Sequence, residues 1–361
     1  MIKNKKVIYA DFTNDESRFI VEYLNDQHHW QPVFFHSVNK SRSWAKERFP
    51  NAVFHDLFAM RQSNFDYSGI GKPVPIDGKI LNNLSQYELS YLCWLEDTSG
   101  WNFSIYQRRR YYYDVLKYWN TVIHHLKPDL YVAYTWPHLP SDYPLYLLCK
   151  HCYDIPILFV NPVPLLDDKY YLMADSIEDQ SGIVDALYLS DEKLELSDVT
   201  KKYLEHLRSK KATIPKHVAD YYSKLHQLYR KRFLNVLRLL KMILTGIAFK
   251  KSELSFKKNT QSWECDASKL TNIEYVLFRW QLTRKNKRLK NFYKRMIQWP
   301  GYDQKYIYFP APYQPEVLSN LAAGRYEDVF LILDMISQNI PKDWLIYYKE
   351  HPNTFYGKPV I

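Results

Sequence analysis

Short apolar runs alternate with helical patterns from residue 5 to residue 162. The runs at 5–12, 32–37 and 51–55 are rich in Val, Phe and Tyr, and an amphipathic pattern follows the first of them. Strands that are separated by helices cannot pair as tight hairpins, so this order is typical of a parallel α/β sheet. We therefore expect an α/β fold with a parallel sheet.

The clearest strand–helix–strand unit covers residues 128–162. It consists of a strand (DLYVAYT), a loop (WPHLPSD), a helix (YPLYLLCKHCYD) and a second strand (IPILFVNP). In open α/β sheets, ligands bind at the carboxyl ends of the strands. The loop after Thr135, which holds His138 and Asp142, therefore lies where a site can form.

The same rhythm resumes near the C-terminus. A strand at 305–312, a helix at 327–340 and a strand at 343–349 make one β–α–β unit. The roughly 60 residues after position 300 suffice for little more than that unit, whereas a complete α/β domain needs about 100 residues. We therefore expect a second α/β domain that is cut short, as in a fragment of a longer protein.

Between these two regions the sequence is helical and basic, without the alternation that strands show. Residues 233–249 are apolar except for Arg238 and Lys241, and basic residues flank them. Such a helix can lie in a membrane interface against anionic lipid, and it can equally pack between domains. The predicted parts are a first α/β domain at 1–165, a basic helical connecting region at 166–300 and an incomplete second α/β domain at 301–361.

The net charge and the amino-acid composition indicate which classes of molecule the protein could bind. The net charge is +10, which favours an anionic partner such as nucleic acid, acidic lipid or a phosphorylated substrate. Only 9 residues are Gly whereas 17% are aromatic, which argues against a Gly-rich phosphate loop. Such a composition favours large amphipathic contact surfaces, as in sugar or nucleobase recognition.

Four Cys residues are too few for a disulfide scaffold in a chain of this length, so a reducing compartment is expected. The N-terminus lacks a secretory apolar run, and no stretch of 18 uncharged apolar residues occurs. We therefore predict a cytoplasmic protein, with a peripheral position at the inner membrane face as an option that the basic apolar helix leaves open.

Two segments at strand ends could carry chemistry, FPAPYQPE at 309–316 and YYKEHP at 347–352. Backbone N–H groups of the following turns, together with Lys349 and His351, could hold a phosphate. Gln314 and Glu316 could supply hydrogen bonds to a base or a sugar. By spacing alone the signal is weak, since strand-end His-Pro pairs also occur in ordinary loops.

The arrangement YIYFPAPYQPE followed by KDWLIYYKEHP resembles the central part of capsular polysaccharide biosynthesis proteins, a family similar to Kdo-transferase-type glycosyltransferases of the GT-B architecture. The segment at 127–160 resembles that family's first Rossmann-like domain more loosely. The positions that match are Gln314, Pro315, Glu350, His351 and Pro352. A later Gly/Thr/Ser-rich donor loop of the family has no counterpart in this sequence, which leaves open whether the chain is active alone.

The resemblance implies two facing Rossmann-like domains, with a nucleotide-sugar donor mainly on the C-terminal domain and a glycan or glycolipid acceptor on the N-terminal one. The expected enzyme is therefore a nucleotide-sugar-dependent glycosyltransferase of capsular or surface polysaccharide assembly. Lys349 and His351 would stabilise the leaving phosphate. Neither a cofactor nor a metal is expected, because no metal-ligand spacing stands at a strand end.

The acceptor hydroxyl needs a base to take its proton. The first candidates are Asp142 and His138, and the second are Glu96 and Asp97 at the end of a helix. Asp142 is also well placed to be a helix N-cap. Arg109, within the run Arg108–Arg110, could bind an anionic acceptor, although a solvated helix face explains this run as well.

Two other functions fit the same residues. A GT-B-shaped sugar-nucleotide epimerase would need carboxylates in the cleft but no acceptor site. A non-enzymatic basic protein could bind nucleic acid or lipid headgroups through the aromatic helix at 103–119 and the basic helix at 271–297. No recognised nucleic-acid motif is present and the basic residues are scattered, so no nucleic-acid partner is expected.

Overall fold

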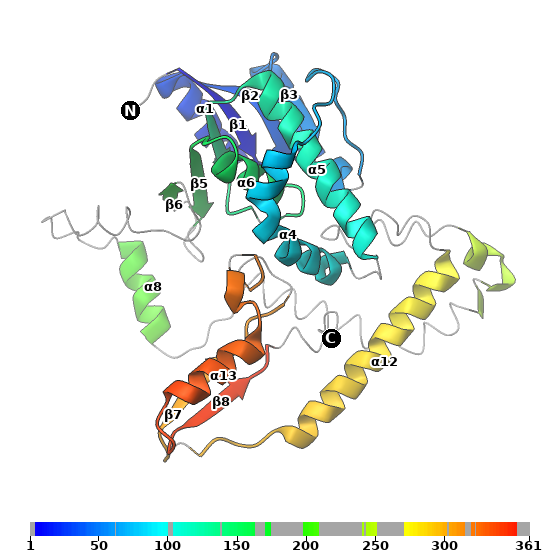
Figure 1. The fold of residues 1–361 in the computed structure, drawn as a ribbon, viewed down its shortest axis with the longest axis vertical. Helices are drawn as coiled ribbons and strands as arrows, with labels where there is room; N and C mark the ends of the chain where they lie inside the picture. Colours follow the sequence, from blue (N-terminus) through cyan, green and yellow to red (C-terminus); the bar gives the residue numbers. More distant parts are fainter. Residues whose placement is uncertain are drawn as a thin grey trace, which may run out of the picture. The chain divides into compact units, whose positions relative to one another are not determined.

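The computed structural model (Figure 1) describes residues 4–61, 63–99, 104–137, 139–162, 170–174, 198–208, 240–241, 243–250, 271–301, 303–314, 319–321 and 323–351. The chain forms two compact units. The first contains Met1–His55, Leu126–Trp136 and Tyr153–Leu240, and the second contains Asp56–His125, Pro137–Cys152 and Lys241–Ile361.

The first unit is built on one sheet with the strand order β3-β2-β1-β4-β5-β6. Its first five strands are parallel, which confirms the predicted α/β class and is compatible with a Rossmann-like domain. Strands β2 and β3 lie on one side of β1, and β4 and β5 lie on its other side, so the direction in which strands are added reverses between β1 and β4. The strands are β1 (Lys5–Ala10), β2 (Trp30–Ser37), β3 (Val53–Asp56), β4 (Leu130–Ala133), β5 (Ile157–Pro162) and β6 (Tyr170–Ala174).

Alternation along the strands places one set of apolar side chains in a common core. Val7 and Tyr9 of β1 are fully buried, and they pack with Phe35, Val132 and Val160 from the neighbouring strands. The ring of Tyr9 is stacked on that of Phe35 at a centroid distance of 5.8 Å. Some of the many aromatic residues of the sequence therefore lie in this core rather than on a binding surface.

Strand β6 lies in a region that the sequence predicts to be helical and free of strands. It pairs antiparallel with β5, from Leu158 opposite Ala174 to Pro162 opposite Tyr170. Five residues are too few to show a clear period, and the exposed backbone edge of β5 supplies the partner that local sequence cannot reveal. The expectation of a strand-free segment here is wrong.

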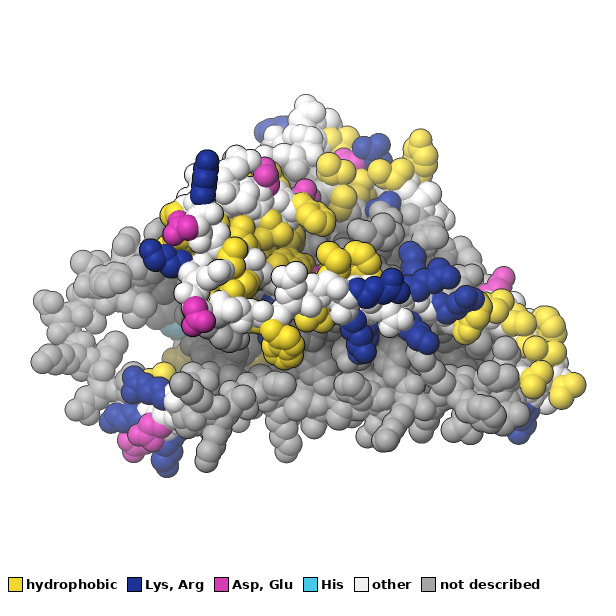
Figure 2. All heavy atoms as spheres, turned by 90° about the horizontal axis from the view of Figure 1, so that it is seen from below, with side chains coloured by type: hydrophobic (Ala, Val, Ile, Leu, Met, Phe, Trp, Pro, Cys, Tyr) yellow, Lys and Arg dark blue, Asp and Glu magenta, His cyan; other side chains and the backbone are white. Residues whose placement is uncertain are grey.

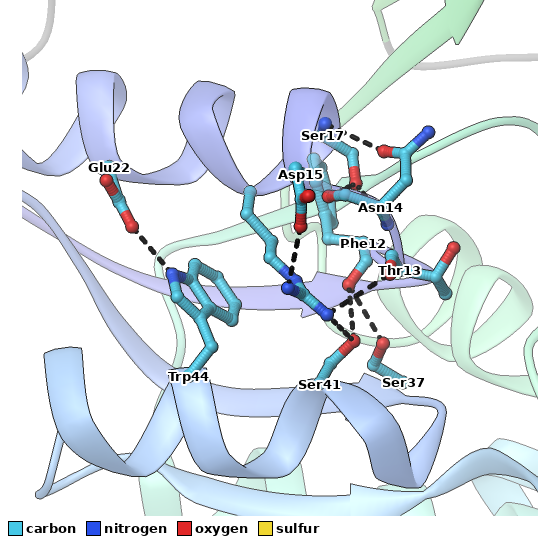
Figure 3. A network of polar contacts seen from close by, with 10 residues as sticks. Phe12, Thr13, Asn14, Asp15, Ser17, Glu22, Ser37, Ser41 and Trp44 are labelled. Carbon is cyan, nitrogen blue, oxygen red and sulfur yellow. Dashed lines mark hydrogen bonds and ion pairs between the residues drawn. The ribbon is translucent and has the colours of Figure 1, made fainter.

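Helix α1 (Asp15–His28) starts at a capping box, in which Asn14 and Ser17 each accept a hydrogen bond from the other's backbone N–H. Figure 3 shows the polar network around this start. The Ser37 hydroxyl donates to the Phe12 carbonyl at 2.9 Å, and Arg18 donates to Thr13 O. These bonds fix the loop that follows β1. The other described helices of this unit are η1 (Asn39–Ser41), α2 (Arg42–Arg48) and α8 (Asp198–Arg208).

The first part of the second unit is helical, with α3 (Leu57–Arg61), α4 (Gly78–Ser99), α5 (Ile105–Leu126) and α6 (Tyr143–His151). Buried side chains tie these helices to loops: Tyr91 Oη donates to Pro140 O, and Trp119 Nε1 donates to Ser141 O. Gly71 has a φ of +144°, and a Cβ there would stand 2.8 Å from the His125 ring. Only Gly fits this approach of the 63–77 loop to α5.

The C-terminal part of the same unit contains η2 (Ile247–Phe249), α12 (Asn272–Met296), β7 (Tyr306–Pro310), η4 (Gly324–Tyr326), α13 (Val329–Asn339) and β8 (Leu345–Lys349). Strands β7 and β8 are parallel, with Tyr306 opposite Leu345 and Pro310 opposite Lys349. The predicted β–α–β unit is therefore present. Of the predicted apolar helix at 233–249, residues 233–239 and 242 lie outside the described residues, whereas 245–249 form a turn and η2 rather than a continued α-helix.

Among the helices that the structure describes, none combines the length and the apolar character that crossing a bilayer requires.

Candidate functional site

The carboxyl ends of β7 and β8 bring the two predicted segments together. Ala311 N donates to Lys349 O at 2.8 Å, which continues the pairing just beyond β7. The rings of Tyr313 and His351 then lie 5.3 Å apart between centroids, at an angle of 39°. The two turns that the sequence singles out are thus neighbours at one edge of the sheet.

Glu350 is the most constrained acidic group at this edge. Its Oε2 accepts hydrogen bonds from Tyr293 Oη and from Tyr348 Oη, each at 2.8 Å, and its Oε1 accepts one from His351 N at 3.0 Å. Burial, and then the neighbouring carboxylate, raise the pKa of Tyr293 to about 12. The same causes raise the pKa of Tyr348 further, so both phenols remain protonated and donate to the Glu350 side chain.

His351 is half-buried beside this carboxylate. Desolvation lowers the pKa of its imidazole, and Glu350 opposes that effect. The neutral ring is therefore the resting state at neutral pH, with one N–H to donate and one nitrogen to accept. An anion that binds here would favour the protonated ring, so the site can couple ligand binding to proton uptake.

Gln314 is already engaged by its own loop. Its Nε2 donates to Glu327 O at 2.7 Å and to Ser319 O at 3.3 Å, and these bonds close the segment between β7 and α13. The side-chain amide nitrogen is therefore a structural donor. Lys349 is exposed at the end of β8. The remaining predicted positions, Pro315, Glu316 and Pro352, lie outside the described residues.

On the first sheet, the strand-order reversal lies between β1 and β4, where the carboxyl-end crevice of an α/β sheet forms. The residues just after these strands, Asp11 and Thr135, both have positive φ, at 66° and 88°. Thr is β-branched, and its left-handed backbone is held by the bond from Thr135 N to Val160 O at 3.2 Å. Such strain is common where a loop is shaped for function.

Asp142 stands at the N-cap position of α6, as the N-cap interpretation predicts, but its side chain caps no helix N–H. Its Oδ1 instead accepts a bond from Ser141 Oγ at 2.8 Å, and only 2% of the residue is exposed. Acting as a base would require the preceding loop to open. Glu96 and Asp97 belong to the last turns of α4, but their side chains lie outside the described part of the chain, as does His138.

Arg109 lies on the exposed side of α5, where its Nε is paired with Glu88 of α4. Glu88 also accepts a bond from Tyr113 Oη at 3.1 Å, and hydrogen bonding to Glu88 raises the pKa of Arg109. Arg108, its neighbour, is buried, and its Nη1 donates to Leu92 O at 2.7 Å. The three consecutive arginines therefore do not form one anion-binding cluster.

Sequence reasoning missed the tyrosines of the C-terminal site. Tyr313 and Tyr348 lie within the two segments at 309–316 and 347–352. Their closeness in sequence to Gln314 and Glu350 could have identified them as site residues. Tyr293 is 57 residues from Glu350 in sequence and belongs to a basic helix whose pattern gives no reason to single out this tyrosine. The hydrogen bond from Tyr293 Oη to Glu350 identifies it.

No group of three or more His, Cys, Asp or Glu side chains that could hold a metal ion occurs among the residues that the structure describes. No protein-family model matches the chain, and no curated protein matches it. The site is therefore interpreted from its own chemistry.

Proposed function

We propose that the chain is a nucleotide-sugar-dependent glycosyltransferase of surface polysaccharide assembly, with the donor held at the carboxyl ends of β7 and β8. The observation that carries this proposal is the convergence of Tyr313, Glu350 and His351 at that edge. Parallel α/β units bind nucleotides at this position, and the parallel pairing of β7 with β8 supplies the geometry.

The residues suit two parts of a nucleotide sugar. The carboxylate of Glu350 is held as an acceptor by two phenols, which fits a ribose or sugar hydroxyl better than it fits a phosphate. Lys349 and His351 supply the cationic and N–H groups that a phosphate needs. The Tyr313 ring beside His351 offers a face for a base or a sugar.

In the proposed reaction, an acceptor oxygen forms a bond to the anomeric carbon while the bond from that carbon to the phosphate oxygen breaks. The phosphate leaves with the electron pair, stabilised by Lys349 and His351, and the acceptor proton passes to a carboxylate or an imidazole. Asp142 and His138 are the proposed bases, Glu96 and Asp97 are the alternatives, and Arg109 is proposed to contact an anionic acceptor.

The test is thermal unfolding of the chain with CMP-, UDP- and GDP-sugars. One nucleotide class should stabilise the fold by about 2.7 kcal/mol at a concentration about 100 times its Kd, which raises the Tm by several degrees. His351→Ala should abolish the shift, whereas His124→Ala, which changes an exposed His on α5, should retain it.

The competing hypothesis is a basic binding protein, and α12 is the element that favours it. Single-stranded RNA is therefore the second ligand in the same experiment. Stabilisation by RNA that disappears with salt, together with no response to any nucleotide sugar, would overturn the transferase proposal. A response to a nucleotide sugar without transfer of the sugar to any acceptor would favour the epimerase. We also propose that the enzyme works at the inner face of a membrane.

A further inference from the structure

Helix α12 carries most of the net positive charge of the chain. Its 25 residues include eight Lys and Arg against one acidic residue, Glu274, a net charge of +7 compared with +10 for the whole sequence. Those whose side chains the structure describes are all exposed: Arg284, Lys285, Lys287, Arg288, Lys290, Lys294 and Arg295. Positive charge at this density is suited to a polyanionic surface.

The same helix exposes large apolar side chains. Leu277, Trp280 and Phe292 are each about half exposed, and Trp299, just beyond the helix, is 93% exposed. Leu277, Trp280 and Phe292 lie on one side of the helix, because steps of three or four residues connect them. Arg284 and Arg288 occupy the intervening steps, so apolar and cationic side chains share this side. The guanidinium of Arg284 lies 4.5 Å from the centroid of the Trp280 ring.

A second apolar segment lies against this helix. Residues 243–249 include η2, which contacts α12, and they expose Leu244 and Phe249 while Lys241 and Lys250 flank them. Figure 2 shows dark blue Lys and Arg side chains beside yellow hydrophobic ones on the side where α12 lies. We call α12 together with 243–249 and 297–299 the basic-aromatic surface.

We propose that the basic-aromatic surface binds an anionic lipid bilayer, lying in the plane of the headgroups. Trp and Phe rings favour that depth, while Lys and Arg can bury their stems and keep their charges at the phosphates. Exposed aliphatic side chains such as Leu244 and Ile297 gain free energy from the acyl boundary. Single-stranded nucleic acid offers stacking to aromatic rings but little to these aliphatic groups, so lipid is the better partner.

The experiment is co-sedimentation of the full chain with vesicles of phosphatidylcholine alone and of phosphatidylcholine mixed with phosphatidylglycerol. Binding to the anionic vesicles should be at least about tenfold tighter, because each cation near the surface contributes a factor of about five. Raising the salt concentration should weaken it. Equal affinity for both vesicle types would overturn the proposal.

Two sets of variants separate charge from apolar contact. Arg284→Gln with Arg288→Gln should weaken anionic binding by about 25-fold, from two factors of about five. The matched control, Lys46→Gln with Lys79→Gln, removes exposed cations outside the surface and should change nothing.

The apolar variant replaces Trp280, Phe292 and Trp299 by Ser, and its control replaces Phe19 and Leu89, which are equally exposed on α1 and α4. Only the first should lose binding by tenfold or more. Circular dichroism and the unfolding midpoint verify that each variant is folded. Retained vesicle binding in the first variant, or binding to single-stranded RNA without binding to vesicles, would contradict the lipid assignment.

Discussion

His351 lies between an aromatic ring and a carboxylate, and its protonation therefore responds to whatever binds beside it. The Tyr313 ring is 5.3 Å away between centroids, and the residue's own backbone N–H donates to Glu350. Desolvation favours the neutral imidazole. If a phosphate binds here as proposed, its negative charge would favour the protonated ring, and the proton would be taken from solvent.

Nucleotide-sugar affinity should accordingly depend on pH. The pKa of free His351 lies below 6.5, and a bound phosphate raises it, so affinity should rise as pH falls from 8 and level off below the pKa of the free ring. Isothermal titration calorimetry at pH 8, 7 and 6 measures the slope, and His351→Gln should remove it. A flat profile for the unaltered chain would place the phosphate elsewhere.

Gly71 illustrates a backbone requirement at a single position. Gly71→Ala should destabilise the fold by about 1–3 kcal/mol, because the added Cβ meets the His125 ring at a φ that L-residues rarely adopt. Urea unfolding measures the change. Gly78→Ala is the matched control, since a Cβ there meets nothing within 4 Å, and it should be neutral or slightly stabilising. Equal effects in the two variants would refute the close-approach explanation.

At the scale of elements, α1 depends on the bonds at its first turn. The reciprocal bonds between Asn14 and Ser17 satisfy backbone donors that the helix cannot satisfy itself, and Ser17 is fully buried. The loop between β1 and this helix is further tied to Ser37 of β2. The cap therefore helps to position the loop at the carboxyl end of β1 as well as the helix.

Asn14→Ala should reduce the free energy of unfolding by about 1 kcal/mol, since one N–H at the start of α1 loses its acceptor. Chemical unfolding followed by circular dichroism gives the value. Asn82→Ala, at an exposed position inside α4, removes the same side chain without a cap and should not destabilise. Destabilisation by both variants would mean that the cap is not the cause.

The elements also show how far sequence can lead. Apolar runs and helical periods predict the strands of the first sheet and the β7–α13–β8 unit, because each has a strong local pattern. Strand β6 escapes prediction, since its five residues are set by pairing with β5. Arg108 and Arg109 have the same chemistry, yet only their rotation about the α5 axis decides which is buried.

At the scale of the whole molecule, one helix has a net charge close to that of the entire chain, although basic residues occur throughout the sequence. A sequence count gives +10, but α12 alone holds +7 of it, and the first sheet hides its aromatic residues inside. The residues of the candidate site differ in whether sequence alone could identify them. Glu350 and His351 could be selected from sequence because they follow a strand, whereas Tyr293 could be found only from tertiary contact.

Tyr293 gives α12 a second attachment, because the helix that presents the basic-aromatic surface also donates a hydrogen bond to Glu350 at 2.8 Å. Helix α12 therefore links the proposed bilayer-binding surface to the carboxylate beside His351. If lipid binding shifts α12, the affinity for substrate changes as well. Thermodynamic linkage then requires that bound substrate change the affinity for lipid by the same factor. The hydrogen bond from Tyr293 to Glu350 would then couple substrate affinity to membrane binding.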